Sequence, residues 1–498
     1  MIAERFRHLT AWLRERSGGI LGDSFIYALP SLASAVLGLI LTPLVTRRLT
    51  LEEYGQVENF NVLVASLGVI AGLNLATATA VLLRSGDSGE ESKRVVSSVG
   101  ALSLLSVVIA SMTIGIFGDS LGRFLGWGNW ASRLVYLAAL SSASASFLGI
   151  LQTSLRQRFE RKKSVVVSLV GPLTYAGLII VLVGAAGGGL ESVLTALVAG
   201  AIVSLLLGTV FVRRELDWGS ISVQMMGAAL KISLPFCIAG WAATVTKSAD
   251  RFLLMAWASE PLEKVALYAA AEKLLIPIQL VSQGFAVAFP PIAMRLAHSG
   301  EAAEGFKKIY IGYVGLSSLL MVVATAASPL VAIALLPRTF HGAIALVPAV
   351  SLYLAMAYLF YVFSGGLLAT GQTQWLTLAS VAAAVLNVSL NAFWIPSFGL
   401  MGAIWATNVA ITAYALLVGF AAERVYPVGY PRMCLVAYVS AYGLADLSLR
   451  GLVWAALAIL LQFGLVFMMR ILYSPRVGVS APDAPGGRDG VTPDDVRV

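Results

Sequence analysis

The sequence has few charged residues. Asp, Glu, Lys and Arg make up 12% of its 498 residues, whereas 58% of the residues are hydrophobic. Soluble proteins carry about 25% charged residues, so half of that fraction indicates a surface that mostly faces hydrocarbon. The alternation of apolar and polar residues that a membrane β-barrel needs is also absent. The composition therefore excludes a soluble protein and predicts an all-α integral membrane protein.

Cysteine and histidine are also scarce. Both cysteines, Cys237 and Cys434, lie inside apolar runs, and the three histidines are far apart in the chain. This distribution offers neither a disulfide framework nor a group of residues with metal-ligand spacing. A phosphate-binding Gly-Lys-Ser/Thr loop is missing as well, which argues against ATP hydrolysis. We therefore expect no cofactor and no metal.

Long apolar runs separated by short connections dominate the rest of the sequence. A membrane-spanning helix needs about 20 apolar residues, and about 14 runs are long enough. We predict helices over residues 23–45, 57–83, 95–118, 131–153, 164–185, 189–212, 230–256, 263–290, 306–335, 342–368, 373–395, 399–420, 431–449 and 451–473. The predicted outer turns are too short to build a catalytic site, so we do not expect an enzyme.

Basic residues are distributed unequally between the two sides of this layout. With the N-terminus in the cytoplasm, the inner segments hold 24 Lys and Arg and the outer turns hold 7. Such a bias is the topology signal of membrane proteins, so the net charge of +8 does not indicate nucleic-acid binding. We predict cytoplasmic termini, with an amphipathic segment over residues 1–18 and a disordered tail over residues 474–498.

A weak internal repeat divides the chain. Leu29-Pro30 is followed 17 residues after the proline by Arg47, and Leu234-Pro235 is followed 16 residues after its proline by Arg251. We therefore predict two pseudo-repeated six-helix lobes, over residues 19–215 and 216–425, and a C-terminal helix pair over residues 426–473. Such repeats commonly place a substrate site in a central cavity between the lobes.

Several charged residues fall inside the apolar runs. Lys247, Asp250 and Arg251 lie in one predicted helix at a spacing that puts them on one face, and Glu272 and Lys273 lie in the next. A charge at the bilayer centre costs about 2.5–3.5 kcal/mol, so it seldom faces lipid. Two interpretations stay open: a wet cavity whose cations hold an anionic group, or ion pairs that only join the two helices.

Uncharged polar residues add to this pattern. Amides suit sugar hydroxyls, but they also join helices when no ligand is present. We expect them to line the cavity or to connect helices; they are Asn74, Gln279, Gln283, Asn387 and Asn391. Pro277, just after Glu272 and Lys273, predicts a kink in that helix.

Three blocks of the sequence resemble the polysaccharide transporter family, the lipid-linked oligosaccharide flippases. The first is TPLVTRRLTLEEYG; the second is SLPFCIAGWAATVTKSADRFLL with the following ALYAAAEKLL and AFPPIAMRL. The third runs from LLATGQTQWL through LNVSLNAFWIPSFGLMGAIWAT. Together the blocks extend over most of the chain, in the family's order. The resemblance places the chain in a superfamily that also contains multidrug and toxin extrusion antiporters and the lipid II flippase.

The resemblance implies a flippase that moves an undecaprenyl-diphosphate-linked oligosaccharide across the bacterial inner membrane by alternating access. Lys247, Arg251 and Lys273 would then bind the anionic head group, and Asp250 or Glu272 would balance charge or couple transport to a proton or sodium gradient. A polysaccharide polymerase and a chain-length regulator are possible partners, besides membrane lipids.

Two alternatives within the superfamily remain. A cation-coupled multidrug or metabolite antiporter would need an acidic cavity, whereas the intramembrane charge here is net positive. A lipid II flippase also takes an anionic substrate and also has fourteen helices, so the sequence separates it less clearly.

Overall fold

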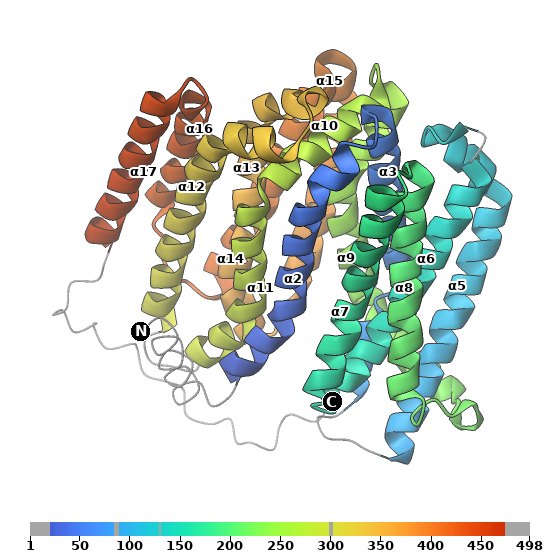
Figure 1. Cartoon of the computed structure of the whole chain (residues 1–498). Coiled ribbons are helices and arrows are strands. Elements are labelled where there is room, and N and C mark those ends of the chain that lie inside the picture. Colours follow the sequence, from blue (N-terminus) through green and yellow to red (C-terminus); the bar gives the residue numbers. More distant parts are fainter. Residues whose placement is uncertain (1–19, 84–88, 129–130, 298–301, 474–498) are drawn as a thin grey trace, which may run out of the picture.

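The structure, a computed structural model, describes residues 20–83, 89–128, 131–297 and 302–473, and these residues contain helices but no β-strand (Figure 1). The segments predicted over residues 1–18 and 474–498 lie outside this part. The helices are α2 (Ile20–Thr46), α3 (Leu51–Gly72), α4 (Leu75–Leu82), α5 (Glu90–Phe124), α6 (Ala131–Gln157), α7 (Arg161–Leu178), the π-helix η2 (Ile179–Ala185), α8 (Leu190–Val212), η3 (Trp218–Ser220), α9 (Val223–Trp257), α10 (Pro261–Leu274), α11 (Ile276–Ala297), α12 (Ala302–Leu335), η4 (Arg338–Leu346), α13 (Val347–Met356), α14 (Leu359–Ala369), α15 (Gln374–Val425), η5 (Arg432–Leu435), α16 (Val436–Ser448) and α17 (Leu452–Tyr473).

Each predicted apolar range coincides with one of these helices, with part of one, or with consecutive helices. Within the described residues, nine helices are long and apolar enough to cross a membrane, or up to eleven if each of two bent pairs is counted as one span. The chain is therefore a multi-pass, all-helical membrane protein. The predicted number of 14 spans is not confirmed by this count and stays a prediction.

Two of the spans are broken by bends. The pair α3 and α4 bends by 45° where Leu73 and Asn74 both adopt the left-handed conformation, with φ of 44° and 51°. The pair α10 and α11 bends by 66° at Leu275, and Pro277 follows as the second residue of α11. Proline is tolerated there because the first N–H groups of a helix have no intrahelical partner. The predicted kink at Pro277 is thus present.

The helix α15 contains 52 residues but is folded back on itself. At Gly399 the backbone leaves the helical region, with φ 57° and ψ −132°, a conformation that glycine adopts without steric cost. Beyond this point the two arms pack antiparallel: a Cβ on Gly402 would lie 2.3 Å from the carbonyl oxygen of Trp394. Each arm is long enough to span a bilayer of about 30 Å at 1.5 Å per residue.

The helices form two groups that share α9. In the N-terminal group α6 packs against α3, α5 and α8, and α7 packs against α8 and α2. In the C-terminal group α14 packs against α15 and α11, and α12 packs against α16 and α17, which lie at one edge of the molecule (Figure 1). The helix α9 packs along α15 but also contacts α3, α4 and α5. The predicted lobe boundaries, 19–215, 216–425 and 426–473, stay predictions.

The two groups meet tightly at the end that the charge bias predicts to be outside. A capping box between Thr50 and Glu53 begins α3 there, which places Tyr54 and Gly55 in its second turn. The Tyr54 ring meets the Phe340 ring of η4 edge-on, with centroids 5.3 Å apart. Gly55 packs directly on the backbone of Leu262 in α10. In this structure the predicted outer end is therefore closed.

Candidate functional site

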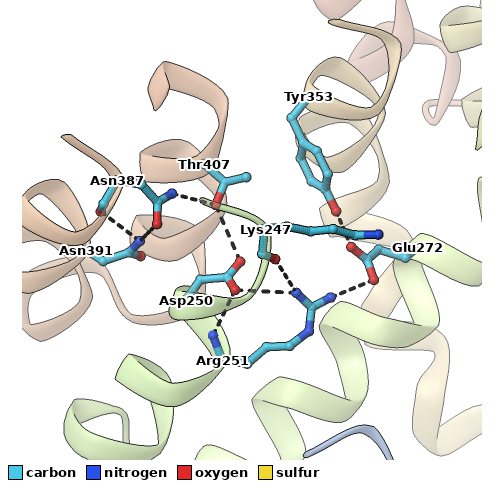
Figure 2. A network of polar contacts seen from close by, with 8 residues as sticks. All are labelled: Lys247, Asp250, Arg251, Glu272, Tyr353, Asn387, Asn391 and Thr407. Atoms are coloured by element: carbon cyan, nitrogen blue, oxygen red, sulfur yellow. Dashed lines mark hydrogen bonds and ion pairs between the residues drawn. The ribbon is translucent and has the colours of Figure 1, made fainter. Parts of the chain in front are cut away.

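Charged residues of α9 and α10 pair with one another inside the bundle (Figure 2). The guanidinium of Arg251 donates from Nη2 to Oε2 of Glu272 at 2.6 Å, and its Nη1 lies 3.4 Å from Oδ1 of Asp250. Asp250 is fully buried and Arg251 is 5% exposed. Removing one partner of a buried ion pair costs about 3–5 kcal/mol because the other charge is left uncompensated. This pairing joins α9 to α10.

Two tyrosines complete the surroundings of this ion pair. The hydroxyl of Tyr353, in α13, donates to Oε1 of Glu272. The guanidinium of Arg251 lies over the ring of Tyr268, 4.6 Å from its centroid, a distance suited to a cation–π contact. The rings of Tyr268 and Tyr353 meet edge-on at 6.4 Å. The ion pair thus ties α9, α10 and α13 together.

Asp250 also faces an oxygen-rich cluster on the α15 hairpin. The hydroxyl of Thr407 donates to Oδ2 of Asp250 at 3.4 Å and accepts from the amide of Asn387 at 3.3 Å. Asn391 donates to Oδ1 of Asn387 at 3.0 Å, and its own Oδ1 is buried without a hydrogen-bond partner. Asn387 and Asn391 are both fully buried. We call Asp250, Asn387, Asn391 and Thr407 the oxygen cluster.

The oxygen cluster contains donor atoms of the kind that hard cations prefer. It supplies a carboxylate, a hydroxyl and amide oxygens, the oxygen donors that hard cations prefer, and Asn391 Oδ1 is a buried acceptor that lacks a donor. A buried polar atom without a partner costs about 1–3 kcal/mol. In the described part of the chain, no group of three or more His, Cys, Asp or Glu side chains could hold a metal ion.

The two predicted lysine ligands differ from Arg251 in their surroundings. Lys247 is exposed and makes no direct ion pair within the described residues, although it is close enough to interact electrostatically with Glu272. Figure 2 shows it on the Glu272 side of the network. Lys273 is half-buried. Arg251 already pairs with two carboxylates, and Lys273 is only partly exposed. Of the three predicted cationic ligands, Lys247 is therefore the most accessible to a solute.

The spacing argument for one shared face holds only in part. Asp250 turns toward Thr407 on α15, whereas Arg251 turns toward Glu272 on α10. Arg251 and Arg47 match in the sequence repeat but not in their surroundings, because Arg251 is buried inside α9 and Arg47 is exposed after the end of α2.

The remaining predicted polar residues are separated by the fold. Gln279 donates to the carbonyl oxygen of Glu272 at 3.0 Å and so satisfies a backbone group at the bend between α10 and α11. Asn74 accepts from the hydroxyl of Thr77 at 2.9 Å at the bend between α3 and α4. Gln283 is exposed on α11. Asn387 and Asn391 are thus the only predicted amides that join the network of Asp250.

Sequence reasoning did not identify Tyr268, Tyr353 or Thr407 as members of this network. Tyr353 lies in an apolar run with no charge near it, and Thr407 lies on the second arm of α15, 157 residues after Asp250. Only Tyr268, five residues from Lys273, was close to a charge in the sequence. A hydroxyl that lies near an intramembrane charge can be recognised only when the packing of the helices is known.

A family model described as polysaccharide biosynthesis protein matches residues 20–296. The chain belongs to this family. The matched segment contains the ion pair between Arg251 and Glu272. None of the curated proteins matches the chain significantly.

Solved structures share the fold at low sequence identity. A lipid II flippase, MurJ, in an inward closed conformation is 15% identical, with a TM-score of 0.65 over 90% of this chain and 99% of that chain. An inward-facing multidrug resistance transporter of the MATE family is 17% identical, with a TM-score of 0.64 over 81% of this chain and 95% of that chain. A transporter of the same superfamily from Pyrococcus furiosus is 16% identical, with a TM-score of 0.58 over 82% and 96%. The chain therefore has the fold of this superfamily of membrane transporters.

Proposed function

We propose that this chain is a flippase that moves an undecaprenyl-diphosphate-linked oligosaccharide repeat unit from the inner to the outer leaflet of the bacterial inner membrane. Membership of the polysaccharide biosynthesis family supports the pathway, and the transporter fold supports movement across the membrane. A sugar diphosphate cannot cross hydrocarbon unaided, whereas its polyprenyl tail can stay in lipid. The protein's task is then to shelter the head group between its helices.

The observation that best supports an anionic cargo is the position of Lys247. Its amine is exposed within a membrane-spanning helix and lacks a direct ion pair in the described residues. An exposed charge at this depth needs water or a counter-charge near it. A diphosphate would provide that counter-charge. Arg251 and Glu272 then hold α9 and α10 in register, with Lys273 and Gln283 as further contacts for the head group.

Alternating access requires the closed outer end to open. In the structure α3 contacts α10 where Gly55 packs on Leu262. It also contacts η4, through the rings of Tyr54 and Phe340. Because these contacts join the two helix groups, their separation would open a path toward the predicted outer side. We assign the structure to a state in which the head group cannot leave toward the predicted outer side.

The oxygen cluster would couple this motion to an ion gradient. A proton or Na⁺ at Asp250 would neutralise the extra negative charge of the trio Asp250, Arg251 and Glu272, and Na⁺ would also satisfy Asn391 Oδ1. An ion can shift a conformational equilibrium only if it binds the two states differently. The cluster draws its residues from α9 and both arms of α15, so movement of α9 against α15 would change its affinity.

The remaining assignments follow from the same proposal. Both termini would be cytoplasmic, because the segments connected on that side hold the excess of Lys and Arg. The product would be delivered to a polysaccharide polymerase and its chain-length regulator at the outer leaflet. Membrane lipids, and not nucleic acid, would surround the chain.

The test is transport by a Lys247→Ala variant in cells that depend on this chain for glycan export. We expect lipid-linked repeat units to accumulate on the cytoplasmic side at wild-type protein abundance, because the substituted side chain is exposed. The matched control is Lys231→Ala, an exposed lysine of the same helix, which should export normally. Normal export by the Lys247 variant would refute the anion contact. Absence of accumulation after deletion of the whole chain would refute the flippase itself.

A further inference from the structure

A basic pocket lies at the predicted inner end of the N-terminal helix group, away from the network of Asp250. Its volume is about 420 Å³. It is lined by residues from the ends of α6, α7 and α8, namely Arg158, Glu160, Lys163, Val210, Phe211, Arg213, Arg214 and Glu215. Four of these residues are cationic and two are anionic, so the pocket has a net charge of +2. We call it the inner pocket.

An ion pair and two hydrogen bonds hold the chain around the inner pocket. Arg158 donates to the carboxylate of Glu215, whose side chain is 10% exposed. The backbone of the same segment is attached to α5, because Ser97 donates to the carbonyl oxygen of Glu215 at 3.1 Å and accepts from the N–H of Asp217 at 2.8 Å. Figure 1 shows the segment between α8 and α9 beside the lower end of α5. These contacts attach the residues that line the pocket to α5 and to Arg158.

The anionic residues of the pocket are already used by two of its cations. Glu215 pairs with Arg158, and Glu160 pairs with Lys163 at 2.6 Å. Arg213 and Arg214 are exposed and form no ion pair within the described residues. Two adjacent guanidinium groups that lack carboxylate partners are suited to a phosphate, which they can bind through several N–H donors.

An apolar row leads into the pocket along α8. Leu206 and Val210 are exposed at 61% and 55% and lie one turn apart, and Val210 and Phe211 also line the pocket. On the partner-free face of a membrane-spanning helix, such side chains face lipid. The row ends at Arg213 and Arg214, three and four residues after Val210. An acyl chain along this row would bring its phosphate to the two arginines.

The pocket at the opposite end of the molecule has a different charge. A pocket of about 480 Å³ at the predicted outer end is lined by Arg47, Glu52 and Glu263 among its nine residues, and these are its charged members. Its net charge is therefore −1, against +2 for the inner pocket. Basic pockets between helices on the cytoplasmic side are typical sites for anionic lipid head groups.

We propose that the inner pocket binds the head group of an anionic phospholipid of the inner leaflet, with its phosphate on Arg213 and Arg214. The lipid is resident and is not the transported cargo. Within the described residues α8 packs mainly on α3, α6, α7 and η2, which belong to the N-terminal group, so the pocket lies on the side of that group. Because residues 213–222 connect α8 to α9, a lipid bound here would brace the connection between the two groups.

The proposal can be tested with the purified full chain in phosphatidylcholine micelles doped with phosphatidylglycerol, by native mass spectrometry of retained lipid. We expect the wild type to retain phosphatidylglycerol in preference to phosphatidylcholine. A double variant, Arg213→Gln with Arg214→Gln, should retain it about 10- to 30-fold less well, since each basic residue near a membrane surface contributes roughly fivefold. Replacement of both arginines by Lys should keep most of the preference.

The matched control is the double variant Arg47→Gln with Arg48→Gln, a tandem of exposed arginines at the opposite end. It should retain phosphatidylglycerol as the wild type does. An equal loss in both double variants, or no loss in either, would overturn the proposal. Glycerol phosphate, which has no acyl chains, should not displace the lipid at equal concentration; if it does, the site is a phosphate site and not a lipid site.

Discussion

The close contact between α3 and α10 offers the sharpest prediction. A Cβ on Gly55 would lie 2.2 Å from the carbonyl oxygen of Leu262 and 2.8 Å from its carbonyl carbon. Both atoms belong to the backbone, so they cannot move aside as a flexible side chain would. Overpacking of this kind costs about 1–3 kcal/mol. Gly55→Ala should therefore shift the equilibrium away from the closed outer end by about 5- to 150-fold.

The shift can be measured by thiol labelling. Thr46 is buried at the same end, so it is a suitable position for a reporter cysteine. The reporter is Thr46→Cys, with Cys237 and Cys434 replaced by Ala. It should react slowly with a membrane-impermeant maleimide added from outside. Adding Gly55→Ala should raise the labelling rate by at least fivefold. The control is Gly38→Ala, because a Cβ there would meet no atom within 4 Å. Equal rates with and without Gly55→Ala would refute the reasoning, as would acceleration by Gly38→Ala.

Two further predictions concern the network of Arg251. Glu272→Gln should lower the free energy of unfolding by about 1.5–3 kcal/mol, the value of a hydrogen bond to a charged group. This is less than the cost of a buried charge left without any partner, because Asp250 stays beside Arg251. Glu304→Gln, which breaks an exposed pair, should change the free energy of unfolding by less than about 1 kcal/mol. Thermal unfolding of the purified protein measures both, and equal unfolding temperatures for the two variants would contradict the buried pairing. Asp250→Asn should abolish the acceleration of transport by an imposed Na⁺ or proton gradient in proteoliposomes. A variant that still responded to the gradient would remove the oxygen cluster from the coupling mechanism.

The positions of the helices were predictable because a membrane imposes a simple condition on each segment. A residue that faces lipid must be apolar, and backbone groups must be satisfied within the segment, so an apolar run identifies a helix without knowledge of its neighbours. Even the turn at Gly399 was visible as a break between two runs, over residues 373–395 and 399–420. Arg47 and Arg251 follow a proline at nearly the same distance in the sequence, but they lie in different surroundings.

The partners of the buried charges were predictable only in part. A charge inside an apolar run must meet an opposite charge or water, and Arg251 and Glu272 were close enough in the chain to suggest each other. Asp250 is different, because besides Arg251 it contacts Thr407, an ordinary polar residue 157 positions away. Nothing local distinguishes Thr407 from other threonines.

The sequence by itself determined that this chain is a helical membrane protein, where its helices lie and which charges fall inside apolar runs, because the cost of polar groups in hydrocarbon acts on each segment separately. Only the tertiary structure decided which charges are paired. It showed that Arg251 is occupied by Glu272 and Asp250, while Lys247 is exposed. The reason is that contacts between helices depend on which faces pack together. An apolar run specifies a helix, but it does not specify the helix that will lie beside it.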